Sequence, residues 1–252
     1  MICAGEIYDY IDSFAPFCTQ MSFDNAGLLI GSREEKSEKV LLALDASKSV
    51  IEEAVRIGAK IIVTHHPVIF HAIKSVSSND EVYLAAKNGL TILSAHTNLD
   101  IAEGGVNDSL AKAVGVTADE RFDEDCALLG HLEQGTDSDG LAQNIQKRMK
   151  LNGLRYTDVN NEIKTVLVSC GAGGSNIYLA NLLKADALIT GEIKHHEIIY
   201  ANERHISVFD LGHFQSENII IDRLADLLSE RFKDTQFIKS KTFTDRTKYI
   251  GV

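Results

Sequence analysis

The sequence predicts an α/β protein built from two similar lobes, and three observations support this fold class. Buried strands alternate with amphipathic helices, the second half repeats the pattern of the first, and a polar segment separates the halves. Hydrophobic residues make up 44% of the 252 residues, so the chain can bury a substantial core.

The first half contains a β-α-β unit. KVLLALDAS (39–47) is an apolar strand that ends at an acid, and SVIEEAVRIGA (49–59) has apolar residues at helical spacing. AKIIVTHH (59–66) is again a continuous apolar strand, and residues 81–96 add another helix and strand. Because both strands of the unit are apolar throughout, we expect them in a parallel sheet that is buried on both faces.

The second half repeats this unit. TVLVSCGAGGS (165–175) is a strand that runs into a glycine-rich turn, residues 176–185 are helical, and residues 185–197 contain the next strand. A further strand is expected in HISVFDLGH (205–213). Val40 aligns with Val166 without a gap, which favours an internal duplication. The alternative is that two unrelated β-α-β units look alike.

A polar, acidic stretch at residues 119–140 predicts a boundary near residue 125, between a first lobe (1–125) and a second lobe (126–252). GLAQNIQKRMKLNG (140–153) is expected to be a helix of the second lobe. The last segment, 237–252, alternates as a strand does, and the sequence leaves open which lobe it joins.

Composition limits the classes of partner and location. The formal net charge of −11 makes nucleic acid and anionic membranes poor partners. No apolar stretch approaches the roughly 20 residues of a membrane span, and the amino terminus lacks the basic region of a signal peptide. The four cysteines form no C-x-x-C pair. We therefore expect a cytoplasmic protein without a structural zinc site.

Histidines and acids collect at the predicted carboxyl ends of strands. His65 and His66 end one strand, directly before Pro67. His96 and Asp100 follow another strand of the first half, and His213 and Glu217 follow the matching strand of the second half. In open α/β sheets, ligands bind beyond the carboxyl ends of the strands. We expect these side chains to converge on one crevice between the lobes.

This pattern favours a site for two divalent metal ions. Neighbouring side chains on a strand point to opposite faces, so His65 and His66 suit two ions better than one. Imidazoles and carboxylates without cysteine suit Zn, Mn, Fe, Co or Ni, and a pair of such ions forms a hydrolytic centre. The alternative is that each histidine is an ordinary, hydrogen-bonded residue at a strand end.

Several segments together resemble the family of GTP cyclohydrolase 1 type 2 homologues, also called the NGG-interacting-factor-like family. They lie over almost the whole chain in the order of the family: FDNAGLLIG (23–31), THHPVIF (64–70), SAHTNLDIAEGGVNDSLA (94–111), VSCGAGGSNI (168–177), ALITGEIKHHE (187–197) and FDLGHFQSE (209–217).

The resemblance implies two α/β lobes around a dinuclear metal site and assembly into a hexameric ring. Its metal ligands fall on His65, His66, Asp100, His213 and Glu217, with Glu217 expected to touch both ions. The family does not use the histidine at position 96 as a ligand. His96 is therefore expected to support a ligand or to transfer a proton, and we place it with Glu217 in the catalytic group.

Two residues depart from the pattern of the family, which has tryptophan at Phe23 and aspartate at Glu192. The longer carboxylate of Glu192 leaves the geometry next to the site open. CGAGGS (170–175) is read as a tight turn, with an anion-binding nest as the alternative. His195 and His196 either line the crevice or lie on the surface.

Three functions stay open. The first is a metal-dependent hydrolase that resembles GTP cyclohydrolase, in which water attacks C8 of the guanine of GTP and formate is released. The second is a metal-dependent hydrolase with another small-molecule substrate. The third is a non-catalytic, metal-binding regulatory or scaffold protein that acts through its ring assembly.

Overall fold

The computed structural model describes residues 1–248 and 250, and these residues form two compact units. The first unit contains Met1–Glu103 and Ile220–Thr244. The second contains Gly104–Ile219 and the described residues that follow Thr244. The boundary expected near residue 125 falls inside the second unit, because the residues on both sides of it are strands of one sheet.

The first unit is built on a five-stranded sheet with the order β13-β4-β5-β6-β2. Its strands are β1 (Ile2–Cys3), β2 (Gly27–Ile30), β3 (Lys36–Ser37), β4 (Lys39–Ala43), β5 (Ile61–Thr64), β6 (Thr91–Ser94) and β13 (Gln236–Lys239). Its helices and helical turns are α1 (Ala4–Phe14), η1 (Phe17–Thr19), α2 (Lys48–Ile57), α3 (Glu81–Lys87), α4 (Thr97–Ile101) and α10 (Ile219–Arg231). The small pair β1-β3 forms a separate sheet.

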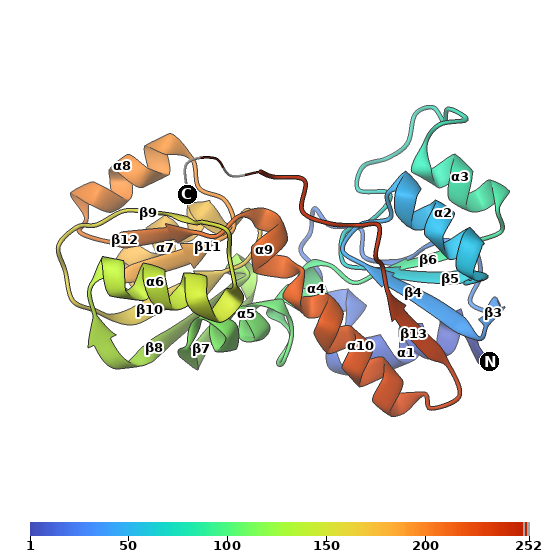
Figure 1. Cartoon of the computed structure of the whole chain (residues 1–252), viewed down its shortest axis with the longest axis horizontal. Coiled ribbons are helices and arrows are strands. Elements are labelled where there is room, and N and C mark those ends of the chain that lie inside the picture. Colours follow the sequence, from blue (N-terminus) through green and yellow to red (C-terminus); the bar gives the residue numbers. More distant parts are fainter. Residues whose placement is uncertain (249, 251–252) are drawn as a thin grey trace. The chain divides into compact units, whose positions relative to one another are not determined.

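The centre of this sheet is parallel and buried on both faces, as the apolar runs predict. Val40 of β4 pairs with Ile61 of β5, and Ile61 pairs with Thr91 of β6. Helices α2 and α3 cover one face, where Val50 of α2 and Ala85 of α3 share a core cluster with the sheet. Helices α1 and α10 cover the other face (Figure 1).

The second unit is built on a six-stranded sheet with the order β7-β8-β10-β11-β12-β9. Its strands are β7 (Val116–Phe122), β8 (Ala127–Thr136), β9 (Arg155–Tyr156), β10 (Ile163–Ser169), β11 (Ala187–Thr190) and β12 (Ser207–Asp210). Its helices and helical turns are α5 (Val106–Val114), η2 (Asp123–Asp125), α6 (Ser138–Met149), η3 (Gly173–Asn176), α7 (Ile177–Leu182), α8 (His195–Glu203) and α9 (His213–Glu217).

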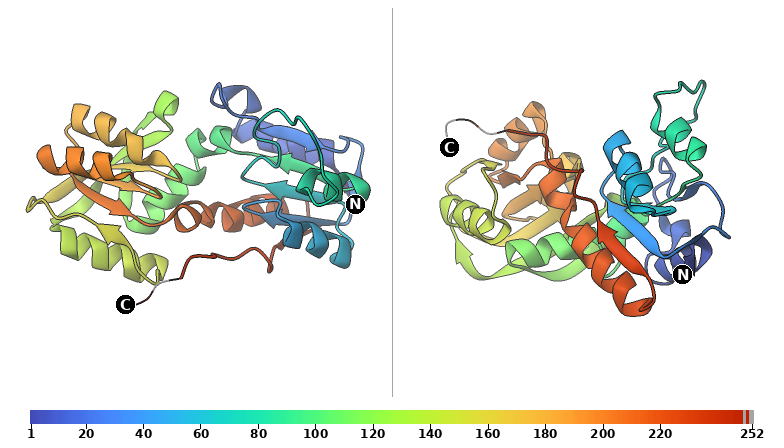
Figure 2. Two further views of the ribbon diagram at one scale, coloured as in Figure 1. Left: turned by 90° about the horizontal axis from the view of Figure 1, so that it is seen from above. Right: turned by 45° about the vertical axis from the view of Figure 1, so that its right-hand side comes forward.

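Strands β10, β11 and β12 form a parallel centre like that of the first unit. Val166 pairs with Ala187, and Ala187 pairs with Ser207. Helices α7 and α8 cover one face, and α5 and α6 lie on the other (Figure 2). Both sheets thus have three parallel central strands joined through helices, which confirms the α/β class. That the two units arose by duplication stays a prediction.

The stretch 119–140 is not a linker. It contributes to β7 and β8, which pair antiparallel with each other, and β8 pairs antiparallel with β10. The side chains at positions 117–121 of β7 are exposed, because β7 is the edge strand of the sheet. An edge strand with a solvated face carries polar residues, and this polarity resembled a boundary.

The helix expected after the acidic stretch is present, with slightly shifted bounds. The helix expected in residues 140–153 is α6, which lies in the second unit as expected. Helices α9 and α10 are separated at Asn218, and the two compact units divide between Ile219 and Ile220. Among the described residues, no helix has the length and apolar character needed to cross a bilayer.

The carboxyl-terminal segment joins the first sheet through β13, which pairs parallel with β4. The buried carboxylate of Glu53 on α2 accepts hydrogen bonds from Ser240 Oγ (2.6 Å), Lys241 N (3.1 Å) and Thr242 Oγ1 (2.9 Å). Burial alone would raise the pKa of Glu53, but these hydrogen bonds lower it below its ordinary value of 4.5. One ionised side chain therefore holds the segment after β13.

We expect Glu53→Gln to lower the free energy of unfolding by about 1–3 kcal/mol at pH 7, because one charged acceptor oxygen is replaced by an amide NH2 that faces other donors. A lowered pKa stabilises the fold above pH 4.5, and this contribution is lost as the pH falls below that value. Urea unfolding at several pH values measures both effects. A variant with unchanged stability at pH 7 would contradict the role of Glu53.

Candidate metal centre

Three histidines of the first unit meet where two neighbouring parallel strands end. His65 and His66 follow β5 directly, and His96 follows β6 after one residue. The ring centroid of His65 lies 5.0 Å from that of His66 and 5.1 Å from that of His96. One ligand atom from each of the three histidines lies within 4.8 Å of the others. This spacing suits a metal ion held by several imidazoles.

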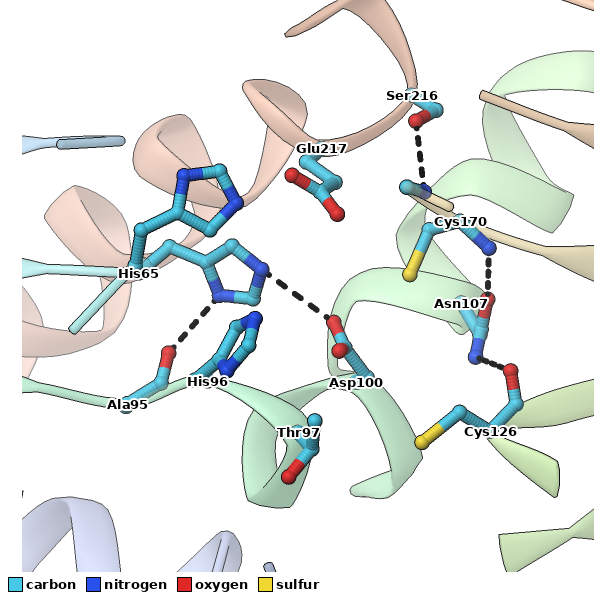
Figure 3. A network of polar contacts seen from close by, with 12 residues as sticks. His65, Ala95, His96, Thr97, Asp100, Asn107, Cys126, Cys170, Ser216 and Glu217 are labelled. Atoms are coloured by element: carbon cyan, nitrogen blue, oxygen red, sulfur yellow. Dashed lines mark hydrogen bonds and ion pairs between the residues drawn. The ribbon is translucent and has the colours of Figure 1, made fainter. Parts of the chain in front are cut away.

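His65 is held in a fixed orientation by its neighbours. Its side chain is buried, and Nδ1 lies 2.9 Å from the carbonyl oxygen of Ala95. A carbonyl only accepts hydrogen bonds, so Nδ1 carries a proton, and in the neutral ring the lone pair is then on Nε2. Nε2 lies 3.5 Å from Oδ1 of Asp100, a buried residue of α4 (Figure 3). His65 and Asp100 thus present donor atoms to one place.

The other two histidines hold carboxylates through the same nitrogen. His66 Nδ1 lies 3.0 Å from Oδ1 of Asp45, which follows β4. His96 Nδ1 lies 2.8 Å from Oδ1 of Asp24. Metal-binding histidines characteristically donate the second ring N–H to a carboxylate or a backbone carbonyl. All three histidines of the first unit's cluster show this pattern.

Asp24 is the best satisfied of these carboxylates. Its other oxygen accepts hydrogen bonds from the backbone N (3.0 Å) and the hydroxyl (2.5 Å) of Thr97, the first residue of α4. Burial alone would raise the pKa of Asp24, but the hydrogen bonds from His96 and Thr97 lower it to about 2. Asp24 is therefore ionised at neutral pH and fixes the ring of His96.

The second unit brings His213 and Glu217 together on α9. The two residues are one helical turn apart, and His213 Nε2 lies 3.0 Å from Glu217 Oε2. His213 Nδ1 lies 2.7 Å from Oε1 of Glu192, so this histidine repeats the pattern of the first unit. Glu217 is buried, with 3% of its surface exposed. The longer side chain at position 192 reaches His213 directly.

The CGAGGS turn lies against this pair. Gly171 has φ +56°, and a Cβ built on it would lie 2.0 Å from Oε1 of Glu217. Its N–H donates to Ser216 Oγ at 3.0 Å. Asn107 of α5 accepts from Cys170 N and donates to Cys126 O, both at 2.9 Å, and so fixes the start of the turn (Figure 3). The glycine makes room for the carboxylate.

We expect Gly171→Ala to lower the free energy of unfolding by about 1–3 kcal/mol, because the backbone is left-handed there. It should also weaken metal binding at least tenfold, because the new methyl group displaces Glu217. Gly89→Ala is the matched control, since Gly89 has φ +63° and nothing lies within 4 Å of its Cβ position. Chemical unfolding and metal titration measure the two effects. Equal metal affinity in both variants would contradict this account.

The sequence-predicted residues therefore fall into two groups. The structure brings His65, His66, His96 and Asp100 together in the first unit, and His213 and Glu217 together in the second. His195 and His196 are exposed in the first turn of α8. Sequence reasoning missed Asp45 as the partner of His66. The acid that ends KVLLALD, on the strand next to β5, was the available signal.

Comparisons of the sequence with known proteins identify a family. The sequence profile of Duf34/NIF3 (NGG1p interacting factor 3) matches residues 2–247. The chain belongs to the Duf34/NIF3 family. A relative from Clostridium perfringens, named GTP cyclohydrolase 1 type 2 homolog, is 32% identical over 98% of this chain and 99% of its own length.

Two solved structures have the same fold as this chain. A hypothetical protein from Staphylococcus aureus superposes with a TM-score of 0.88, at 24% identity over 99% of both chains. Reduced HcgD from Methanocaldococcus jannaschii has a TM-score of 0.83 and 27% identity, over 95% of this chain and 98% of that protein. The shared fold thus extends over nearly the whole chain.

Proposed function

We propose that the chain is a metal-dependent hydrolase in which His65, His66, Asp100, His213 and Glu217 hold two divalent metal ions as one centre. One observation carries the proposal: each of the three histidines in this set places Nδ1 on a hydrogen-bond acceptor. This arrangement directs the lone pair of Nε2 toward a ligand. Within a cluster of donor atoms, such fixed orientation is what a metal centre requires.

The donor atoms fit a catalytic rather than a structural metal. The set contains imidazoles and carboxylates and no thiolate, which suits Zn, Mn, Fe, Co or Ni. When bound, such ions lower the pKa of water toward neutrality and polarise an electrophilic substrate. The two buried carboxylates, Asp100 and Glu217, supply the negative charge that divalent cations require.

His96 is the residue that we propose for proton transfer. The carboxylate of Asp24 fixes Nδ1 of His96, so Nε2 is the atom that accepts or returns a proton. The ring lies 5.1 Å from that of His65, between centroids, and is therefore close to the proposed ligands. Its position also suits a further metal ligand, and one variant separates the two roles.

We expect His96→Asn to keep the metal and to lower turnover by about 10²–10⁴-fold. The amide of asparagine still donates to Asp24, whereas the Nε2 position is lost. Elemental analysis and formate release from GTP measure the two properties. Loss of an ion in this variant would show that His96 is a ligand instead.

The name of the relatives points to GTP as the substrate to test first. We propose that one water attacks C8 of guanine and opens the imidazole ring to a formamide, and that a second water hydrolyses this formamide to release formate. Incubation of metal-loaded protein with GTP should yield formate and a ring-opened product. If formate does not appear, a panel of phosphorylated and cyclic amide substrates tests for another hydrolase.

A metal-loaded protein without turnover on the whole panel would instead favour a regulatory or scaffold role. Assembly into a hexameric ring and a cytoplasmic location complete the proposal. Light scattering of the purified chain tests the hexamer, whose mass should be six times that of the monomer.

A further inference from the structure

Two phenyl rings lie exposed beside the histidines of the first unit. Phe23 is 59% exposed and Phe70 is 39% exposed. Their ring centroids are 6.3 Å apart, and the centroid of Phe70 is 6.0 Å from that of His96. Large apolar side chains are normally covered by other parts of a protein. Here two large apolar side chains lie exposed next to the histidines of the proposed catalytic site.

The loops that carry these rings are fixed to each other and to the histidine cluster. Asn25 Nδ2 donates to the carbonyl oxygen of Ile69 at 2.6 Å, which joins the residues following Phe23 to the residue before Phe70. Between Phe23 and Asn25, Asp24 holds His96 and Thr97. The segment that carries Phe23 is therefore anchored to His96 through Asp24, and the segment that carries Phe70 is anchored to the Phe23 segment through Asn25.

A flat heteroaromatic ring is the ligand that fits such a surface. Bases stack on exposed aromatic side chains in nucleotide-binding proteins, and each stacked base contributes strongly to binding. We propose that Phe23 and Phe70 form a platform on which the purine ring of the substrate stacks, next to His96. This inference rests on the proposed function, which supplies the chemistry beside the platform.

Exposed phenyl faces suit such a platform better than polar side chains do. A polar contact would select one edge of a base, whereas phenyl faces bind any purine by area and shape. The platform thus provides affinity for the ring. Discrimination among purines has to come from other residues.

The test uses the absence of tryptophan from the chain. In the Phe23→Trp variant, the single tryptophan reports on its surroundings, and guanosine should quench or shift its emission. Phe70→Ala in this background should weaken guanosine and GTP binding about tenfold. Binding of inorganic triphosphate, which lacks the ring, should not change. Tyr83→Ala is the matched control, because Tyr83 of α3 is also 39% exposed.

Failure of this inference differs from failure of the proposed function. Unchanged guanosine and GTP affinity in Phe70→Ala, or no response of the introduced tryptophan to any purine nucleoside, would overturn the platform even if the metal is bound. A change of oligomeric state in Phe23→Ala or Phe70→Ala, without an effect on nucleoside binding, would also overturn it and assign the rings to a subunit interface. If the protein binds purine nucleosides but takes up no divalent metal ion, only the hydrolase proposal is contradicted.

Discussion

Glu217→Gln is expected to lower the affinity for divalent metal by about a hundredfold or more and to abolish turnover. The change removes the negative charge but keeps the shape of a side chain that is 3% exposed and lies 3.0 Å from His213. Substitution of a residue that only hydrogen-bonds to a metal ligand typically lowers metal affinity about 10–100-fold. Substitution of a ligand itself should lower the affinity at least as much. Elemental analysis after dialysis and calorimetric titration with Zn²⁺ measure the loss.

Glu203→Gln is the matched control, because Glu203 is an exposed residue at the end of α8 in the same unit. It removes the same charge from the surface and should leave metal content and turnover unchanged. Circular dichroism shows whether Glu217→Gln still folds. A folded Glu217→Gln variant with full metal content would show that Glu217 is not a ligand.

His66→Asn should weaken metal binding to an extent comparable with Glu217→Gln. Asparagine keeps a donor for the carboxylate of Asp45, which lies 3.0 Å from Nδ1 of His66, and removes only the Nε2 position. The protein should therefore fold normally while its metal content falls by about one ion per chain. Elemental analysis of the dialysed variant measures this loss.

His131→Asn is the matched control for His66→Asn, because it also removes a histidine that is hydrogen-bonded to a carboxylate but lies outside the proposed metal site. His131 of β8 also places Nδ1 on a carboxylate, 2.7 Å from Oδ2 of Asp119, but its side chain is 49% exposed. The same substitution there should change neither metal content nor turnover. Equal metal content in the two variants would remove His66 from the ligand set.

The parallel centre of each sheet could be predicted because burial on both faces leaves a continuous apolar run. Residues 39–43 and 61–64 show this signal clearly. The sequence could not identify β7 as a strand, because its exposed side chains are as polar as those of a linker. The second half of β8 is also exposed and polar, which hid the buried apolar residues at its start. Neither could it show that α10 returns to the first unit, since such long-range contacts leave no local pattern.

The site also contains features that the sequence could predict and features that it could not. His65, His66 and His96 could be predicted to meet, because parallel neighbouring strands end at the same edge of a sheet. The role of Gly171 could not, because it depends on the carboxylate of a residue far along the chain. Among the partners of Nδ1, the acid at position 192 was already marked by its place next to the site, whereas the carbonyl group of Ala95 leaves no signal in the sequence.

Anomalous diffraction at the absorption edge of the metal, from crystals of Zn²⁺-loaded protein, tests the central claim most directly. The account predicts two peaks, with Nε2 of His65 and His66 at about 2.0–2.1 Å from metal and Glu217 among the ligands. Strong peaks elsewhere in the protein, with these imidazoles unligated, would contradict it.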